Sequence, residues 1–421
     1  MRVNGKPIDP AVPFERRPFK PTFPGEQPGR FEAHGGSESV RPIAATPFRL
    51  RNAADVPRRQ WLYGHTFIRG FVTVTAAPGG LGKSSLAIVE ALALATGRNL
   101  LGVQPPKRCR VWLWNGEDPI DELERRVLGA ALHFGIKAAD LEGWLFVDSG
   151  RQMEITLAKQ ERNAVVVTEA VVAGLVEEIR ALNIDLVVID PFVSSHQVSE
   201  NDNGAIDRVA KAWGRIADLT GCAVHIVAHT RKTGGNEVTA DDMRGASALL
   251  AAARVGRVLN GMSKDIGSQL GIENYRQFFR VSTDKANLAP RSDDEAWFEL
   301  VSVDIRNGDE RHPSDMVGVP TCWQRPDAFQ GMTEWHMQEV RRRALQAEPP
   351  YRFDPQAASM WIGELVGDVA RLNPQNPADR ARICTILKTW FASGALTKVD
   401  GDWKDEKGRH RPIVRPGELK D

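Results

Sequence analysis

The stretch VTVTAAPGGLGKSSLAIVEALAL, residues 72–94, decides the fold. The apolar run Phe71–Ala76 predicts a buried strand, and the run Ser84–Thr96 predicts a helix. Between the two lies a glycine-rich turn that ends in Gly-Lys-Ser. Its glycines let backbone N–H groups point at phosphate oxygens, and the helix N-terminus adds its dipole. This order of strand, loop and helix predicts a Walker A phosphate-binding loop.

Individual residues of this loop have distinct predicted roles. Lys83 is expected to contact the β- and γ-phosphates of ATP, and Ser84 is expected to ligate Mg²⁺. Ala77 occupies the first position of the motif, where the strict pattern has glycine. A small residue suffices there because this position ends the strand. The predicted nucleotide-binding residues are Ala77, Pro78, Gly79, Gly80, Leu81, Gly82, Lys83, Ser84 and Ser85.

A second strand supplies an acid for the metal ion. The segment NIDLVVIDP, residues 183–191, predicts a buried strand over Leu186–Ile189 with Asp190 at its carboxyl end. In open parallel sheets, ligands gather at the carboxyl ends of the strands. Asp190 is therefore predicted to be the Walker B aspartate, which holds Mg²⁺ beside the phosphates.

Hydrolysis also needs a group that orients and deprotonates water. In WLWNGEDP, residues 112–119, Glu117 follows the predicted strand Arg110–Trp114. It would lie at the same sheet edge as the phosphate loop and Asp190, so we predict that Glu117 is the catalytic base. Asp118 precedes a proline, a pattern typical of a residue that caps the next helix.

Two further groups complete the predicted site. His229 follows the predicted strand Ala223–Ala228 at the same edge, where its side chain would contact the γ-phosphate and report its loss. An arginine from a neighbouring subunit can stabilise the charge on a γ-phosphate. The candidates for this role are Arg244, Arg254 and Arg257.

The alternation of strands and helices predicts an α/β fold with a mainly parallel sheet. The remaining predicted strands are Trp144–Val147 and, as an antiparallel edge, Gln277–Thr283 and Ala296–Val303; the remaining helices are Ile120–Phe134, Ala164–Leu182 and Ala205–Thr220. The predicted regions are a proline-rich disordered or extended tail (1–54), an ATPase core (55–305), a linker rich in glycine, proline and charge (306–334) and a small domain (335–421).

Composition and charge exclude some classes of protein. Hydrophobic residues make up 42% of the chain and charged residues 26%, as in ordinary globular proteins. Residues 1–59 carry 11 Lys and Arg against 6 Asp and Glu, and residues 335–421 carry 15 against 12, so the net charge of +1 leaves −7 between them. Such modestly basic ends permit a polyanionic partner without requiring one. No apolar run approaches the ~20 residues of a membrane span, and no signal-peptide pattern starts the chain, so we expect a cytoplasmic protein.

The C-terminal segment predicts a winged helix. The predicted elements are a helix, Pro377–Ser393, and two strands, Ala395–Val399 and Arg411–Val414, around a turn that would form the wing. Bound to DNA, such a domain would place Arg382 and Lys388 in a groove and Lys407, Arg409 and Arg411 on the backbone. The acidic residues of the wing leave open a winged helix that binds protein instead.

With these motifs assembled, the sequence resembles the RecA-type ATPases, and in particular the plasmid RepA-like hexameric replicative helicases. The resemblance covers about residues 60–265 and rests on five motifs in order: APGGLGKS, NGEDP, LVVIDP, DLTGCAVHIVAHTRK and RGASALLAAAR. It implies roles for four residues: Glu117 as the water-activating acid, Asp190 as the Walker B aspartate, His229 as the sensor and Arg254 as the arginine finger that acts in the neighbouring subunit.

The resemblance also implies partners. The family forms ring hexamers, with ATP at the subunit interfaces and single-stranded DNA in the channel. The loops that would face this DNA are residues 194–205, which are polar and acidic, and residues 230–244, which offer Arg231 and Lys232. Neither loop contains Phe, Tyr or Trp, although single-strand grooves usually combine basic residues with stacking aromatics.

The predicted function is that of an ATP-dependent DNA helicase or translocase in the replication of a plasmid or prophage, with ATP and Mg²⁺ as cofactors. The alternative is an ATP-switched DNA-binding initiator, helicase loader or regulator without unwinding activity. The complete catalytic set and the family resemblance favour the helicase, whereas the poor DNA-facing loops favour the switch.

Overall fold

The computed structural model describes residues 2–3, 6–7, 45–162, 164–230, 237–239, 242, 246–290, 295–325, 327–400, 403–405 and 408–418. The chain divides into two compact units, residues 1–57 and 58–421. The described elements of the first unit are β1 (Arg2–Val3), β2 (Lys6–Pro7) and the 3₁₀ turn η1 (Ala53–Asp55). Most of the predicted tail, residues 1–54, lies outside the described residues. Among the described helices, none combines the length and the apolar character needed to cross a membrane.

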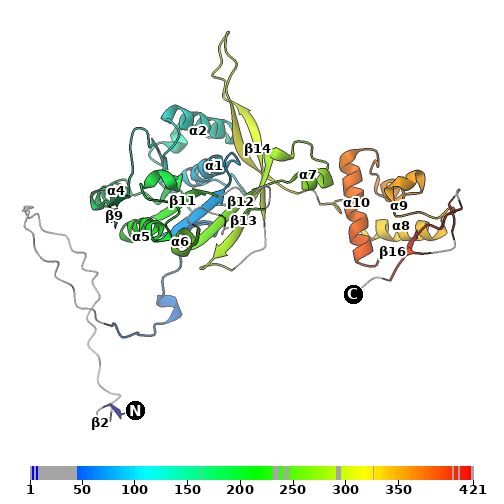
Figure 1. Cartoon of the computed structure of the whole chain (residues 1–421), viewed down its shortest axis with the longest axis horizontal. Helices are drawn as coiled ribbons and strands as arrows, with labels where there is room; N and C mark the ends of the chain where they lie inside the picture. Colours follow the sequence, from blue (N-terminus) through cyan, green and yellow to red (C-terminus); the bar gives the residue numbers. More distant parts are fainter. Residues whose placement is uncertain are drawn as a thin grey trace, which may run out of the picture. The chain divides into compact units, whose positions relative to one another are not determined.

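A sheet of nine strands organises the described part of the second unit (Figure 1). In spatial order the strands are β15 (Met316–Trp323), β14 (Ala296–Asp304), β13 (Phe278–Ala286), β12 (Val255–Gly261), β5 (Val72–Ala77), β11 (Ala223–His229), β10 (Leu186–Asp190), β6 (Val111–Asn115) and β7 (Leu145–Ser149). The strands from β12 to β7 are parallel, and β13 to β15 extend the sheet in antiparallel fashion. The predicted α/β fold, mainly parallel with an antiparallel edge, is confirmed.

Helices cover both faces of this sheet. They are α1 (Lys83–Thr96), α2 (Ile120–Phe134), α3 (Ala138–Leu141), α4 (Glu169–Ala181), α5 (Asn203–Thr220), α6 (Ala246–Ala252) and α7 (Lys264–Leu270). Successive residues of a strand point to opposite faces, so each parallel strand contributes to two cores. In β6, Trp112 and Trp114 pack with α4 and α5, whereas Val111 and Leu113 pack with α1 and α2.

Shorter elements connect these layers. They are β3 (Trp61–Tyr63) paired with β4 (Phe67–Ile68), β8 (Ala158–Glu161) paired with β9 (Ala164–Val167), and the 3₁₀ turns η2 (Phe192–Ser195) and η4 (Tyr275–Gln277). The predicted helix Ala164–Leu182 is therefore wrong at its start, since β9 occupies its first residues and α4 begins only at Glu169. The valines at 165–167 are β-branched, which favours a strand.

The predicted linker, residues 306–334, contains β15, so that prediction is wrong for residues 316–323. Val317 and Val319 are 8% and 1% exposed and face the core. A Cβ built on Gly129 of α2 would lie 2.8 Å from Val317 Cβ, so this glycine permits the close packing of strand on helix. The surrounding glycine, proline and charged residues conceal this short alternating apolar pattern in the sequence.

The C-terminal elements share a core of their own. They are α8 (Glu334–Gln346), η5 (Pro355–Met360), α9 (Ile362–Ala370), α10 (Pro377–Ala392), β16 (Leu396–Val399) and β17 (Ile413–Pro416). The predicted helix and strand pair are confirmed, each to within a few residues. Asn376 caps α10 by accepting hydrogen bonds from Ala378 N (2.9 Å) and Asp379 N (3.1 Å), and Pro377 follows at the first helical position.

A buried ion pair connects the phosphate-loop strand, the following helix and β12. The guanidinium of Arg257 on β12 donates to both carboxylate oxygens of Glu90 on α1, at 2.6 and 2.9 Å. Its Nε donates to Thr75 Oγ1 on β5 at 3.1 Å. All three side chains are buried. The pair therefore fixes α1 against the sheet directly behind the phosphate loop.

We expect that Arg257→Ala lowers the free energy of unfolding by about 3–5 kcal/mol, because it leaves the Glu90 carboxylate buried without its partner. The free energy of unfolding should fall much less in the double variant Arg257→Met with Glu90→Leu, because no charged group then stays buried without a partner. Urea unfolding followed by tryptophan fluorescence measures both losses. Equal destabilisation of the two proteins would contradict this account of the pair.

Candidate functional site

The loop between β5 and α1 has the geometry of a phosphate cradle. Gly80 and Gly82 have φ angles of 78° and 88°, in the left-handed region that favours glycine. A Cβ built on Gly79 or Gly80 would meet no atom within 4 Å, so space lies open in front of the loop. Lys83 begins α1 directly after this loop and is 9% exposed.

Strand register brings the other candidate groups to the same edge. Parallel pairing aligns His229 of β11 with Ala77 of β5, and Asp190 of β10 with Asn115 of β6. These four residues end their strands, so their side chains and the turns that follow gather at the carboxyl edge of the sheet. The predicted convergence of these strand ends is confirmed.

Asp190 is 3% exposed. Burial raises the pKa of this carboxyl group above its ordinary value, and the hydrogen bond from Ser84 and the positive charge of Lys83 oppose that rise. A buried carboxylate beside a serine hydroxyl offers two kinds of hard oxygen donor. This pair fits Mg²⁺, which prefers oxygen ligands and usually takes one or two carboxylates from a protein.

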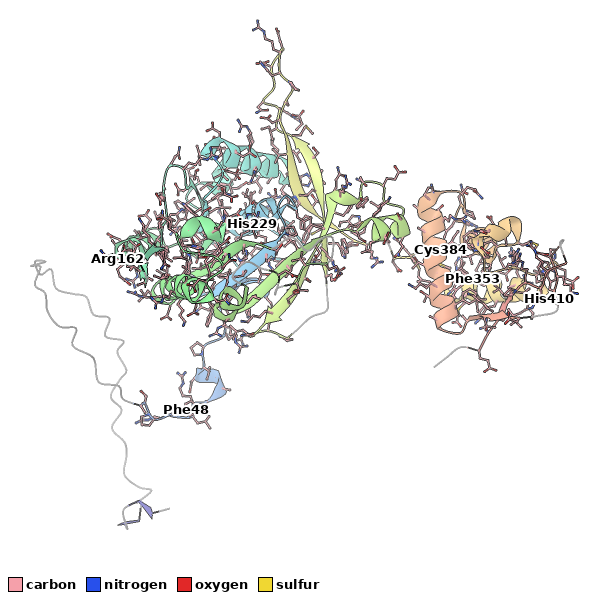
Figure 2. All side chains as sticks on the ribbon, viewed as in Figure 1. Phe48, Arg162, His229, Phe353, Cys384 and His410 are labelled. Carbon is pink, nitrogen blue, oxygen red and sulfur yellow. The ribbon has the colours of Figure 1, made fainter. Side chains whose placement is uncertain are left out.

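Glu117 and His229 approach each other in front of these groups. Glu117 Oε1 lies 3.9 Å from His229 Nε2, and the Glu117 side chain is 54% exposed. Figure 2 labels His229, which ends β11 and is partly buried. A cavity of about 400 Å³ joins the phosphate loop to this region, and its lining includes Lys83, Ser84 and Glu117. A nucleotide phosphate chain and a water molecule can therefore occupy one continuous space.

Asp118 does not cap α2, so the prediction of that role is wrong. Pro119 occupies the cap position, where no side-chain hydrogen bond is formed. Instead, Asp118 Oδ2 lies 2.8 Å from Nη1 of Arg126, one of the residues of α2 that line the cavity. Asp118 also lines the cavity, and it contacts a helix side chain rather than the helix end.

The antiparallel extension supplies a wall of the cavity that sequence reasoning missed. The lining residues from β14 and β15 are Leu300, Met316, Val317 and Gly318. A Cβ built on Gly82 would come within 3.1 Å of Leu300 Cδ2, so this strand approaches the phosphate loop closely. Met316 is 58% exposed, although large apolar side chains are usually buried. The alternation of Val317 and Val319 with exposed residues is the one sequence signal that points to this strand.

The three candidate arginines separate in the structure. Arg254 precedes β12, and its N–H donates to Val72 O at the start of β5 (2.9 Å), so it lies at the amino edge of the sheet, opposite the cavity. Its side chain cannot serve the cavity of its own chain. Arg257 is committed to Glu90, which removes it from the candidates. Arg244 lies outside the described residues.

Of the two predicted DNA-facing loops, residues 194–205 are described in full and residues 230–244 only in part. In the loop 194–205, Ser195 and His196 are buried rather than presented to a partner. Burial lowers the pKa of His196 to about 4, so this imidazole is neutral at pH 7. Arg231 and Lys232, in the second loop, lie outside the described residues.

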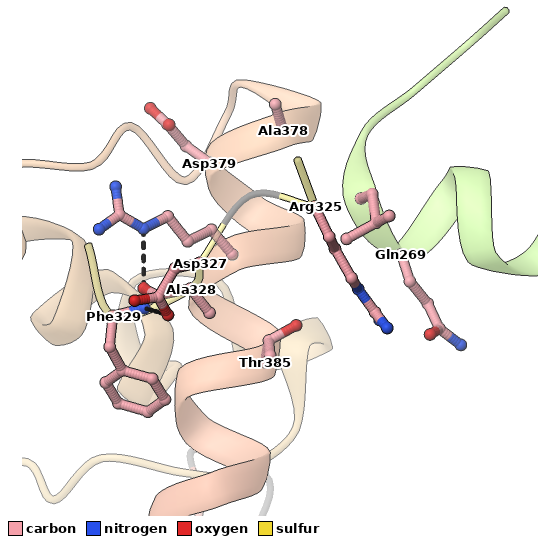
Figure 3. Close-up of a pocket in the computed structure, with 10 residues that line it drawn as sticks. Gln269, Arg325, Asp327, Ala328, Phe329, Ala378, Asp379 and Thr385 are labelled. Carbon is pink, nitrogen blue, oxygen red and sulfur yellow. Dashed lines mark hydrogen bonds between the residues drawn. The ribbon is translucent and has the colours of Figure 1, made fainter. Parts of the chain in front are cut away.

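The basic side chains of the C-terminal region differ in what they contact. Arg382 Nε donates to the backbone oxygen of Ala328 (2.8 Å), and Figure 3 shows Ala328 beside α10. Arg409 and Arg411 each place Nε near Asp405 Oδ2, at 3.3 and 3.1 Å. Lys388, on the exposed side of α10, has a solvent-exposed side chain. The group predicted to bind DNA is thus largely occupied by contacts within the chain.

Gly116 holds the turn that carries Glu117 in a confined position. A Cβ on Gly116 would lie 2.2 Å from Ser194 Cβ and 2.8 Å from the ring of Trp114. On its other side, a Cβ on Gly150 would lie 2.7 Å from Gly116 Cα. Any larger residue at 116 must therefore move the turn, the segment after β10, or both.

We expect that Gly116→Ala slows ATP hydrolysis by about 100-fold, because a displacement of ~1 Å at a reacting group has this order of effect. A steady-state phosphate-release assay measures the rate. Gly174→Ala is the matched control, because a Cβ at this exposed helical glycine meets nothing within 4 Å. Unchanged hydrolysis by Gly116→Ala would show that the confinement of the turn does not matter.

A family model and a solved structure each match part of this chain. Residues 38–235 match the family model described as an AAA domain. A search of solved structures finds similarity to a chain described as the RadB recombinase, at 14% sequence identity, covering 56% of this chain and 89% of that one with a TM-score of 0.38. The matched segment contains the phosphate loop, Glu117, Asp190 and His229. The matched segment and the cavity both include the phosphate loop and Glu117.

Proposed function

We propose that this protein is an ATP-dependent DNA helicase or translocase, similar to the RepA-like hexameric replicative helicases, that acts in the cytoplasm during plasmid or prophage replication. One observation carries the proposal. A single cavity joins the phosphate loop to Glu117, with Asp190 and His229 at the same sheet edge. Phosphate binding alone requires neither Glu117 nor Asp190, whereas hydrolysis requires both acids.

The phosphate loop, Ala77–Ser85, binds the phosphates of ATP. Its backbone N–H groups and the start of α1 provide a positive field, and Lys83 contacts the β- and γ-phosphates. Ser84 and Asp190 hold Mg²⁺. When bound, this ion neutralises charge on the phosphate oxygens.

Glu117 is the general base for the attacking water. Its carboxylate reaches the cavity from a turn whose backbone is fixed, and it remains accessible to solvent. It takes a proton from water as the oxygen attacks the γ-phosphorus, and the bond from that phosphorus to ADP breaks. His229, 3.9 Å from Glu117, contacts the γ-phosphate and transmits its loss to the loop that follows β11.

Arg254 acts in the neighbouring subunit. It lies at the sheet edge opposite its own cavity and is exposed, which supports a contact with the nucleotide of another copy. Each cavity is then completed by an adjacent chain, and the assembly is a ring, which we propose to be a hexamer with single-stranded DNA in its channel. Arg231 and Lys232 are the proposed channel residues.

Residues 335–421 form a winged-helix domain in this proposal, after the ATPase core of residues 55–305. The succession α8, α9, α10 and the β16–β17 pair supports this assignment, as does the hydrogen bond from Val414 N to Tyr351 O (2.8 Å), which adds a third segment to the pair. Lys388 on α10 is exposed and is one of its proposed DNA contacts. Arg382, Arg409 and Arg411 contribute after release from their present partners.

A second candidate function is an ATP-switched initiator, helicase loader or regulator. One observation favours it: the loop 194–205 contains two acids, Glu200 and Asp202, and no Lys or Arg that could bind a DNA strand. In this case ATP binding controls assembly, and the C-terminal domain recognises DNA or a protein partner without unwinding.

We expect that Glu117→Gln binds ATP normally but turns it over at least about 100-fold more slowly, because the general base is lost. Binding is measured with a fluorescent ATP analogue and turnover by phosphate release. Glu177→Gln, the same change at an exposed acid of α4, should leave both unchanged. Near-normal turnover by Glu117→Gln would assign the base to another residue.

Unwinding distinguishes the two functions. For a helicase, we expect single-stranded DNA to stimulate ATP hydrolysis and the protein to displace a strand from a forked duplex in the presence of ATP. Lys83→Ala should abolish displacement, because the phosphates lose their lysine contact. Size-exclusion chromatography with and without ATP and DNA gives the assembly state. Hydrolysis that ignores DNA, without displacement, would support the switch instead.

A further inference from the structure

The turn that carries Glu117 is organised by the side chain of the last residue of β6, Asn115. This side chain is 2% exposed. Its Oδ1 accepts hydrogen bonds from Glu117 N (3.0 Å) and Asp118 N (2.8 Å). An asparagine that accepts from the backbone two and three residues later fixes a tight turn. The direction in which Glu117 leaves the strand therefore depends on this amide oxygen.

The other half of the same amide faces Asp190. Asn115 Nδ2 lies 3.4 Å from Asp190 Oδ2, a long hydrogen bond across directly paired residues of β6 and β10. The backbone adds a shorter bond, from Gly116 N to Asp190 O at 2.8 Å. The buried Asn115 side chain thus contacts both the carboxylate of Asp190, the proposed Mg²⁺ ligand, and the backbone of Glu117, the proposed general base.

Other contacts secure the backbone of the turn and leave the Glu117 carboxylate in the cavity. Ser149 Oγ donates to Asp118 O at 2.6 Å, and Arg151 Nε donates to Glu117 O at 2.9 Å. Ser149 ends β7 and Arg151 follows it, and β7 flanks β6 on the side away from β10 and Asp190. Within the described residues these bonds restrain carbonyl groups, whereas the two N–H groups of the turn depend on Asn115.

We propose that Asn115 is a positioning residue that sets the separation between the Glu117 and Asp190 carboxylates. This inference rests on the proposed function, in which these two acids act on water and on Mg²⁺. Asparagine suits the position because its amide offers an acceptor and a donor at once. Aspartate would place a second carboxylate against Asp190, and an aliphatic residue would leave two N–H groups of the turn without an acceptor.

Asn115 does not line the cavity, so its effect passes through other residues. Removing the amide frees the turn while the phosphate loop keeps all its contacts. We therefore expect Asn115→Ala to lower kcat by about 100-fold, as displacement of a reacting group does. The KM for ATP, and the affinity for a fluorescent ATP analogue measured in EDTA, should change less than about threefold, because uniform binding is untouched.

A double-mutant cycle tests whether Asn115 acts through Glu117. The four proteins are the full-length wild type, Asn115→Ala, Glu117→Gln and the double variant. If Asn115 positions Glu117, Asn115→Ala should lower kcat by less than about threefold in the Glu117→Gln background, because the two effects are then not additive. Equal losses in both backgrounds would overturn the inference. Near-normal turnover by Glu117→Gln alone would instead overturn the proposed function.

Hydrogen exchange gives a readout that needs no hydrolysis. The amides of Glu117 and Asp118 should exchange at least about tenfold faster in Asn115→Ala, while those of α5 keep their protection, since only local opening is affected. Asn115→Ser should restore part of the protection and of kcat, because a serine hydroxyl can also accept from this turn. Unchanged exchange, or no difference between Ser and Ala, would overturn the proposal.

Thr73→Ala is the matched control for the loss of a buried polar group. Thr73 lies on β5, is 1% exposed and bonds His225 Nδ1 at 2.9 Å, away from the cavity. Thr73→Ala should lower the midpoint of thermal unfolding without changing kcat. If Asn115→Ala and Thr73→Ala reduce kcat in proportion to the same loss of stability, Asn115 is a packing residue and the inference fails.

Discussion

Parallel pairing of β5, β11, β10 and β6 is the constraint on which the site depends. Hydrogen bonding along these ladders places Ala77 beside His229 and Asp190 beside Asn115. A slip of one residue in either register would turn each side chain to the opposite face of the sheet. The buried residues on both faces prevent such a slip, because every strand contributes to two cores. The chemistry at the carboxyl edge is thus a consequence of how the interior packs.

Much of this arrangement could be predicted from local patterns. The phosphate loop, Asp190 and the ends of β6 and β11 follow from apolar runs that stop at polar residues, and chain order plus parallel pairing then brings them together. The wall formed by β14 and β15 could not be predicted this way. Its contact with Gly82 joins residues more than 200 positions apart, and only packing in three dimensions specifies it.

The sequence also could not predict roles that depend on which residue a side chain contacts. Arg254 and Arg257 stand three residues apart, yet one is exposed at the amino edge and the other is buried against Glu90, because β12 begins between them. Likewise, Arg409 and Arg411 form ion pairs with Asp405. A count of charges in the sequence would treat both arginines as available to bind DNA. Asn115 sits inside the quoted motif with Glu117, but its amide contacts become visible only when β10 is placed beside β6.

The late position of β15 in the chain has a consequence for biosynthesis. The phosphate loop leaves the ribosome about 230 residues before the strand that walls its cavity, a delay of roughly 10–50 s at ordinary rates of translation. Before β15 is made, β14 is the open edge of the sheet, where β15 will later pair. A nucleotide that binds at this stage contacts the phosphate loop before β15 has closed the cavity. The finished cavity is therefore a product of the completed chain, and premature termination before residue 316 would yield a core that holds phosphate but does not enclose it.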